Sequence, residues 1–288
     1  MEGWSLLKHR LAVALIIAIS LVYLLPIVWI GVTSIKPREL MTKPDVIAFK
    51  PTLEHYERLW IVKAGRGETE RVVGRSDYPR HFSNSLIITA LSTLLAVTLG
   101  TLAAYAFSRF KVKGKTDLMF FILSTRMLPP VAVAIPIYLM YTKFLGWYDT
   151  RIGLIVLYTV FNLSFAVWLM KGFIDEIPKD YEEAAMVDRL SRFKAFIKVV
   201  LPQSVTGLAA TAVFCAISAW NEFAFALFLT QDKARTAPPS IPSAIGTAGI
   251  EWGQIAAGTF LFLLPVALFT FIMRNHLLRG ITFGAIKR

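Results

Sequence analysis

Five polar side chains lie within long apolar runs of the sequence, at positions that a lipid environment would penalise. They are Arg126, Asn162, Ser218, Asn221 and Glu222. Polar and ionisable groups inside a membrane mark either a solute pathway or a satisfied polar network between packed helices. The sequence leaves both interpretations open, and Arg126 could also extend toward the membrane surface or pair with another residue.

No catalytic or metal-binding set accompanies these residues. The four histidines are scattered without the spacing of metal ligands: His9, His55, His81 and His276. The single cysteine, Cys215, excludes a disulfide within the chain. The stretch VKGKT at 112–116 ends like a phosphate-binding loop, but Arg109 occupies the position of its first glycine and no apolar strand precedes it. We therefore expect no enzymatic activity, metal or nucleotide site in this chain.

The elements that must hold the polar residues are membrane spans. Of the 288 residues, 56% are hydrophobic and 17% are charged, and the mean hydropathy is +0.58. The apolar residues gather in runs near the length of about 20 residues that a helix needs to cross a bilayer. The runs are Leu11–Thr33, Asn84–Phe107, Leu118–Thr142, Ile152–Met170, Thr206–Thr230 and Ile255–Met273. They predict an all-α membrane protein with six transmembrane helices, and not a β-barrel of short alternating segments.

Basic residues in the connecting segments predict the orientation. Four of them lie in the ten residues 108–117, and others lie in the N-terminal stretch and the tail, so we expect these segments in the cytoplasm. The long segment 34–83 runs against this rule with ten Lys and Arg, but it also carries seven acidic residues, and long loops follow the rule poorly. Both termini should be cytoplasmic in a multi-pass protein of the inner (plasma) membrane. The net charge of +12 then mostly reflects this bias, and no nucleic-acid partner is expected.

This topology divides the chain into successive regions. They are a cytoplasmic N-terminus (1–10), a first span (11–33), an outer loop (34–83), a core (84–274) that contains a polar segment at 177–202, and a cytoplasmic tail (275–288).

The polar segment reads EEAAMVDRLSRFKAFIKVVLP over residues 182–202, and it predicts a helix–turn–helix. Asp180 and Glu183 fit a capping box at the start of a first helix, and Ser191 can cap a second one. Pro202 then interrupts the chain before the fifth span.

One face of the first helix of this segment carries small side chains. Tyr181, Ala184, Ala185 and Asp188 follow one another at i, i+3, i+4 and i+7, which places them on one side of a helix. A small flat patch between charges suits insertion into a cleft of another protein. The alternative is an amphipathic helix lying on lipid, which explains the apolar second helix, with Phe193, better than the first.

This segment resembles the EAA loop of the permease subunits of bacterial and archaeal ABC importers, E-A-A-x-x-x-G followed by I-x-L-P. The matching positions are Glu183, Ala184, Ala185, Ile197 or Val199, Leu201 and Pro202, whereas Arg189 replaces the glycine of the family. In the family this loop is the coupling helix, seated in a cleft of the ATP-hydrolysing subunit. The resemblance implies that contact for Tyr181, Glu183, Ala184, Ala185, Met186, Asp188, Arg189 and Phe193.

Further stretches are similar to the carbohydrate-uptake, maltose-type branch of these permeases. They are NSLIITALSTLLAVTLGTLAAYAFSRF, RMLPPVAVAIPIYLMYTKFLGWYDTRIGLI, SAWNEFAFALFLT and RGITFGAIKR, which together cover about residues 83–288. The resemblance implies a type I ABC importer permease fold and a sugar or related polyhydroxy solute. It also implies three kinds of partner: a second related permease, an ATPase dimer that binds ATP and Mg, and an extracytoplasmic solute-binding protein. Residues 60–80 look like an insertion in the outer loop.

The fifth run predicts how a transport path could be built. Gly207, Thr211 and Cys215 form a stripe of small residues that allows close helix packing. On a helical wheel, Ser218, Asn221, Glu222 and Phe225 fall on the same side as this stripe. The opposite side holds Val213, Ala216, Trp220, Phe223 and Leu227.

In the third run, Pro129, Pro130 and Pro136 predict bends. A self-sufficient secondary carrier or channel is the alternative function; it predicts charges in mid-membrane and internal repeats, and we find no repeat.

Overall fold

The computed structural model describes residues 2–43, 45–46, 48–64, 71–241, 245–246 and 249–283. Residues 65–70 of the predicted insertion and 284–288 of the predicted tail lie outside the described residues. The chain separates into two compact units. Unit 1 comprises Met1–Pro79 and Ser240–Leu264, and unit 2 comprises Arg80–Pro239 and Pro265–Arg288.

Unit 1 combines long helical segments with small sheets. Its elements are α1 (Glu2–Ser34), η1 (Arg38–Leu40), α2 (Glu54–Trp60), β1 (Ile61–Ala64), β2 (Arg71–Arg75), β3 (Ile245–Gly246), β4 (Gly249–Ile250) and the first part of α13 (Trp252–Phe283). The strands pair antiparallel, β1 with β2 and β3 with β4, and the first pair contains a register shift between Val62 and Lys63. The predicted insertion at 60–80 therefore includes a β-hairpin, a local exception to the expected all-helical chain.

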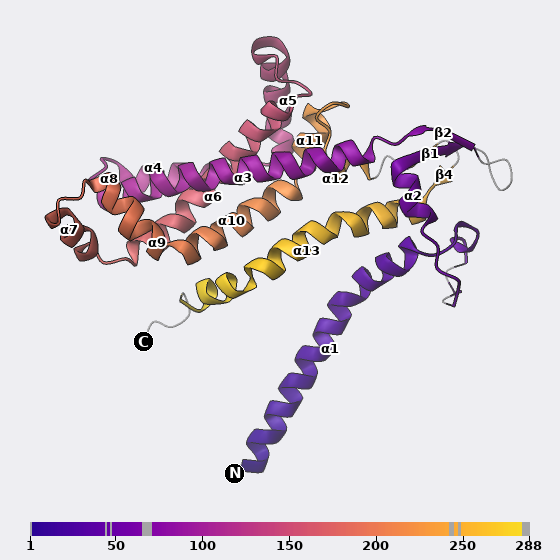
Figure 1. Ribbon diagram of the computed structural model, residues 1–288, viewed down its shortest axis with the longest axis horizontal. Coiled ribbons are helices and arrows are strands. Elements are labelled where there is room, and N and C mark those ends of the chain that lie inside the picture. Colours follow the sequence, from indigo (N-terminus) through magenta and orange to yellow (C-terminus); the bar gives the residue numbers. More distant parts are fainter. Residues whose placement is uncertain are drawn as a thin grey trace. The chain divides into compact units, whose positions relative to one another are not determined.

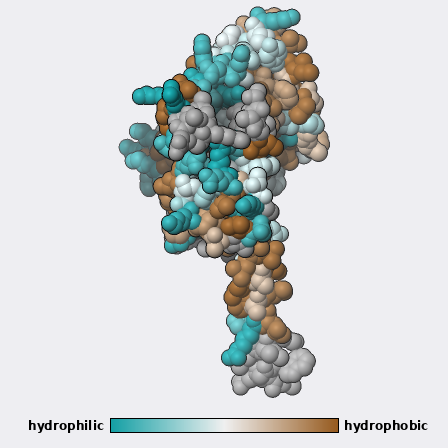
Figure 2. Space-filling view, turned by 90° about the vertical axis from the view of Figure 1, so that its right-hand side faces the viewer, coloured by the Kyte–Doolittle hydropathy of each residue, from teal (hydrophilic) through white to brown (hydrophobic). Residues whose placement is uncertain are grey.

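Helix α1 exposes its apolar side chains. Its hydrophobic stretch His9–Ser34 has a mean hydropathy of 2.8 and buries none of its most apolar window within the chain. Its surface is largely brown in Figure 2, the colour of hydrophobic residues. Exposed apolar area of this extent is unfavourable in water and is expected where lipid or another subunit covers the helix.

Unit 2 is a bundle of helices (Figure 1). Its elements are α3 (Tyr78–Arg109, from Arg80 on), α4 (Lys115–Ser124), η3 (Thr125–Met127), α5 (Pro130–Met140), η4 (Tyr141–Leu145), α6 (Arg151–Asp175), α7 (Asp180–Val187), α8 (Arg192–Ala195), η5 (Phe196–Val200), α9 (Leu201–Gln203), α10 (Val205–Trp220), α11 (Ala224–Leu229), α12 (Ala237–Ser240, to Pro239) and the rest of α13. Helices α7 and α8 lie at one end of this bundle in Figure 1, next to the end of α3.

Four of the predicted runs form continuous helices long and apolar enough to cross a membrane: α1, α3, α6 and α13. The third run is instead two helical segments, Lys115–Met127 and Pro130–Leu145, with an angle of 93° between them. The residue before a proline is driven out of the helical conformation, and both Leu128 and Pro129 precede one and are extended. The predicted bend is confirmed; if each bent pair counts as one span, the described chain has up to six.

The fifth run was predicted as one helix to Thr230, and this is wrong. Helix α10 ends at Trp220, and α11 begins at Ala224 after a break. At its other end, α10 meets the helical segment Arg192–Gln203 at an angle of 76°. That bend lies at Ser204, and Pro202 remains within the helical segment, following the π-helical turn η5. The missing N–H of a proline disturbs the helix, but here the direction changes two residues later.

Small residues bring the helices of unit 2 together. A Cβ at Gly100 would lie 2.5 Å from Cβ of Ala166 on α6, and a Cβ at Gly207 would lie 2.5 Å from Cγ of Phe173. Cys215 is fully buried in a cluster with Ala166. The predicted packing role of the small stripe on α10 is therefore confirmed.

Candidate functional site

The polar segment forms the predicted helix–turn–helix, with α7 as its first helix and the run from α8 to α9 as its second. The Ser191 hydroxyl accepts a hydrogen bond from the Lys194 backbone N–H at 3.4 Å, so the predicted cap of the second helix is confirmed. The predicted capping box does not form. Asp180 is itself the first residue of α7, and Lys179, which precedes it, makes no side-chain cap bond.

Helix α7 has an exposed and a buried side, and the division differs from the predicted face. Tyr181, Ala184 and Asp188 are exposed, as is Glu183, whereas Ala185 is buried within the chain. Residues 182 and 185 are one helical turn apart and both face inward. The prediction of Ala184 and Ala185 as one open patch is therefore corrected, because only Ala184 is open to another protein. Met186 is half-buried, and Phe193 on α8 is exposed.

The turn after α7 keeps the geometry that a glycine would favour. Arg189 has φ 65°, in the left-handed region. For residues other than glycine this conformation costs about 1–2 kcal/mol. Its backbone N–H nevertheless donates to the Met186 carbonyl at 3.1 Å, and that of Leu190 donates to the Ala185 carbonyl at 3.1 Å. Replacement of the family's glycine by arginine therefore leaves the turn in place with local strain.

A buried ion pair connects α7 to the end of α3, and sequence reasoning missed it. Arg109 Nε donates to Glu182 Oε1, and the two side chains are 4% and 6% exposed. Tyr105 Oη donates to Glu182 Oε2 at 2.8 Å, and Arg109 Nη2 donates to the Ile177 carbonyl at 2.9 Å. The spacing of Glu182 and Ala185 puts both residues on one face of α7, but nothing in the sequence signals that this face is buried.

Three of the five intramembrane polar residues come together at the bend of the third run. Arg126, on η3, donates from Nη1 to Asn162 Oδ1 of α6 at 3.3 Å and from Nη2 to Ser218 Oγ of α10 at 3.1 Å. Nη1 also donates to the Phe161 carbonyl at 3.2 Å. The guanidinium carbon lies 5.1 Å from the ring centres of both Phe161 and Phe165. We call Arg126, Asn162 and Ser218 the Arg126 cluster.

The Arg126 cluster holds its cation with neutral partners. No carboxylate lies within ion-pair distance of Arg126 among the described residues. Carbonyl, amide and hydroxyl oxygens and two aromatic faces partly replace water around the charge. A guanidinium has five N–H donors, and the three bonds leave Nε–H and one Nη2–H for another acceptor.

Glu222 is separate from this cluster and closes the break between α10 and α11. Its carboxylate accepts hydrogen bonds from the backbone N–H groups of Phe225 at 2.9 Å and Ala226 at 3.1 Å. It also accepts one at 2.8 Å from the hydroxyl of Tyr158 on α6. These contacts satisfy the free N–H groups at the start of α11 and join that helix to α6.

The remaining predicted path residue, Asn221, is exposed, and its amide donates to the Ile217 carbonyl at 3.0 Å. The predicted wheel is therefore wrong beyond Trp220, because the helix ends there. Val213 and Trp220, placed on the side opposite the small stripe, are buried as well.

At the loops between spans, one carboxylate ties two segments together. Asp149, with φ 53°, accepts hydrogen bonds from the backbone N–H groups of residues 231–234 at 3.0–3.3 Å. Burial disfavours its charge, but these four donors together lower the pKa of Asp149 below 3.8. The contact holds the loop after η4 against the loop after α11.

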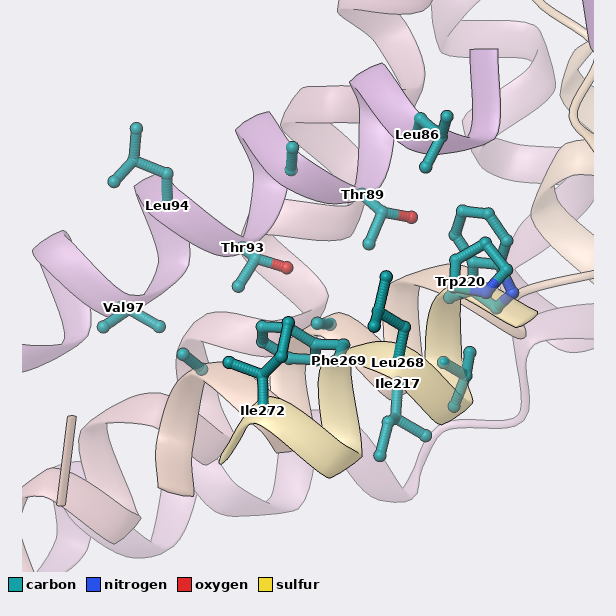
Figure 3. Close-up of a pocket in the computed structure, with 15 residues that line it drawn as sticks. Leu86, Thr89, Thr93, Leu94, Val97, Ile217, Trp220, Leu268, Phe269 and Ile272 are labelled. Atoms are coloured by element: carbon teal, nitrogen blue, oxygen red, sulfur yellow. The ribbon is translucent and has the colours of Figure 1, made fainter. Parts of the chain in front are cut away.

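One hollow of unit 2 is apolar and does not include the polar residues above. It has a volume of about 540 Å³ and lies between α3, α10 and the part of α13 from Pro265 on. Figure 3 shows Thr89 and Thr93 of α3 across this hollow from Phe269 of α13. Two hydroxyl groups in an otherwise apolar lining do not suit a polyhydroxy solute, since its own hydroxyl groups would lose their hydrogen bonds.

Among the described residues, no group of three or more His, Cys, Asp or Glu side chains could hold a metal ion.

Sequence comparison assigns this architecture to a family. Residues 96–282 match the family described as "Binding-protein-dependent transport system inner membrane component". The chain belongs to this permease family. A trehalose/maltose transport system permease protein of Thermococcus litoralis is 32% identical, with 98% of each chain covered. A trehalose transport system permease protein of Mycobacterium tuberculosis is 33% identical, with 92% of each covered.

Solved structures agree on the fold. A chain of a bacterial ABC transporter for the acidic polysaccharide alginate has a TM-score of 0.74 at 20% identity, with 94% of this chain and 96% of that chain covered. A chain of the MetNI methionine ABC transporter has a TM-score of 0.56 at 17% identity, with 69% of this chain and 95% of that chain covered. The predicted type I ABC importer permease fold is confirmed, and this permease works as the membrane subunit of an ABC importer.

Proposed function

We propose that this permease forms half of the translocation path for a sugar or related polyhydroxy solute and receives the motion of an ATPase subunit through α7. The coupling to an ATPase subunit is supported by the exposed side of α7, where Tyr181, Glu183 and Ala184 are exposed to solvent at the end of the bundle. A cleft of the ATPase subunit would cover this side, together with Asp188 and Arg189. ATP and Mg would bind to that subunit alone.

The solute class is inferred from the relatives and from the Arg126 cluster. The relatives named above transport trehalose or maltose according to their names. Two N–H groups of Arg126 have no acceptor among the described residues, and they lie beside an amide and a hydroxyl, which suits the hydroxyl groups of a sugar. Glu222 and Asn221 would act at one end of this path, Glu222 by holding α11 in place.

The assembly implied by this function has four kinds of component. A second, related permease would complete the path, an ATPase dimer would drive it, and an extracytoplasmic solute-binding protein would deliver the solute. Lipid would surround the spans. Both termini and α7 would then lie in the cytoplasm, in agreement with the basic segment 108–117.

Charge reversal on α7 tests the coupling. Glu183→Lys should release the ATPase subunit from the purified complex, because it reverses a charge that the partner would desolvate. Ala184→Trp should do the same, because the larger side chain would not fit a space sized for a methyl group. Asp117→Lys makes the same charge change at an exposed site on α4 and is the matched control. The ATPase subunit bound per permease is measured after affinity purification. Equal amounts in all three variants would refute coupling through α7.

A further inference from the structure

Among the described residues, the hydrogen bonds and ion pairs from α7 side chains to the spans all belong to one carboxylate. Of the side chains on α7, Glu182 alone makes hydrogen bonds or ion pairs to another element among the described residues. Both of its partners, Tyr105 and Arg109, lie in the last two turns of α3. The other charged side chains of α7 point away from the chain and are exposed. Glu182 is therefore the direct polar connection through which a displacement of α7 can act on α3.

Arg109 holds the segment at two points. Its Nε binds Glu182 in the first turn of α7, and its Nη2 binds the Ile177 carbonyl in the connection from α6 at 2.9 Å. Both side chains of the pair are almost fully buried, so water weakens the attraction little. A buried pair whose members have further hydrogen bonds holds a defined geometry, whereas an exposed pair of long side chains does not.

Two aromatic contacts extend this connection to the second helix of the segment. The ring centres of Tyr105 and Phe196, on η5, are 4.6 Å apart. The guanidinium carbon of Arg192 lies 5.1 Å from the ring centre of Phe110, the residue after α3. The end of α3 therefore contacts both helices of the segment. Its contacts with α7 are directional hydrogen bonds to Glu182, whereas those with the second helix are aromatic.

We infer that Arg109 and Glu182, with Tyr105, are positioning residues that transmit the movement of α7 to α3. The inference rests on the proposed docking of α7 in an ATPase subunit, and it adds the route by which that movement enters the spans. Helix α3 packs through Gly100 against Ala166 of α6. A displacement at Arg109 therefore reaches the helix that carries Asn162, a member of the Arg126 cluster.

The test follows ATP-driven movement of α3 without any need to know the solute. In a Cys215→Ala background, a cysteine replaces Leu102, which is exposed on α3, and its rate of reaction with a maleimide is measured in the purified complex. Addition of ATP with vanadate should change this rate when the pair is intact. With Glu182→Gln, the ATPase subunit should stay bound while the response of Leu102→Cys to ATP is lost.

A second variant removes both charges, because a single substitution leaves one buried charge without a partner and can disturb folding. Arg109→Met combined with Glu182→Leu should assemble normally and show the same loss of response. Asp232→Asn is the control, since it breaks an exposed pair with Arg80 at the other end of α3, and it should leave the response unchanged.

The outcomes separate this inference from the proposed function. A normal ATP response in the assembled double variant would overturn the role of the pair, as would an absence of any response at Leu102→Cys in the background protein. Retention of the ATPase subunit by Glu183→Lys would instead refute docking through α7. A purely structural role of the pair would lower ATPase binding and ATP response together, which also contradicts the inference.

Discussion

Replacement of Glu222 by alanine should destabilise the bundle by removing three hydrogen bonds at one point. The carboxylate accepts from the backbone N–H groups of Phe225 and Ala226 and from the hydroxyl of Tyr158, which is 3% exposed. A buried hydrogen bond contributes about 1 kcal/mol net, so Glu222→Ala should cost about 3 kcal/mol. For a chain of 288 residues, that loss corresponds to a fall in thermal midpoint of roughly 5 °C.

The protein carries its own reporter for this measurement. Cys215 is the single cysteine and is fully buried in α10, one and a half turns before the break. A thiol-reactive fluorescent maleimide will therefore report unfolding as Cys215 becomes accessible during heating in detergent. The midpoint of the fluorescence rise for Glu222→Ala should lie well below that of the unchanged protein.

Two further substitutions define the cause. Tyr158→Phe removes one of the three bonds and should produce about a third of the effect, about 1 kcal/mol. Asn221→Ala changes an exposed neighbour and should alter stability by no more than about 0.5 kcal/mol. If Glu222→Ala keeps the midpoint of the unchanged protein but loses transport, the capping role is refuted and Glu222 acts on the solute instead.

Two more predictions use the same thermal assay, and a third, at acid pH, uses the loss of helical circular dichroism on heating, because a maleimide reacts with the thiolate and too little thiolate is present there. Arg189→Gly should raise the midpoint slightly, with a gain in stability of up to about 1 kcal/mol, because glycine adopts φ 65° without strain but loses more entropy on folding; a lower midpoint would contradict this. Gly207→Ala should lower the midpoint, with a loss of stability of about 1–3 kcal/mol, since its Cβ would overlap Phe173, while Gly172→Ala, with open space, should not. Asp149 should stabilise the fold fully above its unfolded pKa near 3.8 and lose this contribution as pH falls through the lower folded pKa. The midpoint difference between the unchanged protein and Asp149→Asn should therefore shrink between neutral pH and about pH 3, and a constant difference would refute the argument.

Some features of the site follow from local sequence and were predictable. The cap at Ser191 was predictable because its hydroxyl accepts a hydrogen bond from a backbone N–H only three residues further along the chain. The bend near Pro129 is local in the same way, because a proline restricts the residue before it. The small stripe Gly207, Thr211 and Cys215 predicted close packing because only small side chains let two helices approach.

Other features depend on partners far away in the chain. The helical wheel drawn through Glu222 failed because α10 ends at Trp220, and periodicity does not reveal that break. The Glu222 carboxylate stabilises the break together with Tyr158, which lies 64 residues away in the sequence. The face of α7 was wrongly assigned for the same reason. Glu182 looks like a surface acid until the end of α3, 73 residues away, supplies Arg109 as its partner.

The six apolar runs were enough to predict a helical membrane protein, and four of them form continuous helices long enough to cross a bilayer. The residue types at 180–202 likewise predicted a helical hairpin with a family signature. These properties depend on hydrophobic length and on residues a few positions apart. The sequence did not indicate which polar groups meet, and the folded chain pairs Arg126 with Asn162 and Ser218, and Arg109 with Glu182. The reason is physical, since a polar group buried between helices is stable only beside a complementary group, and the packing of distant segments selects that group.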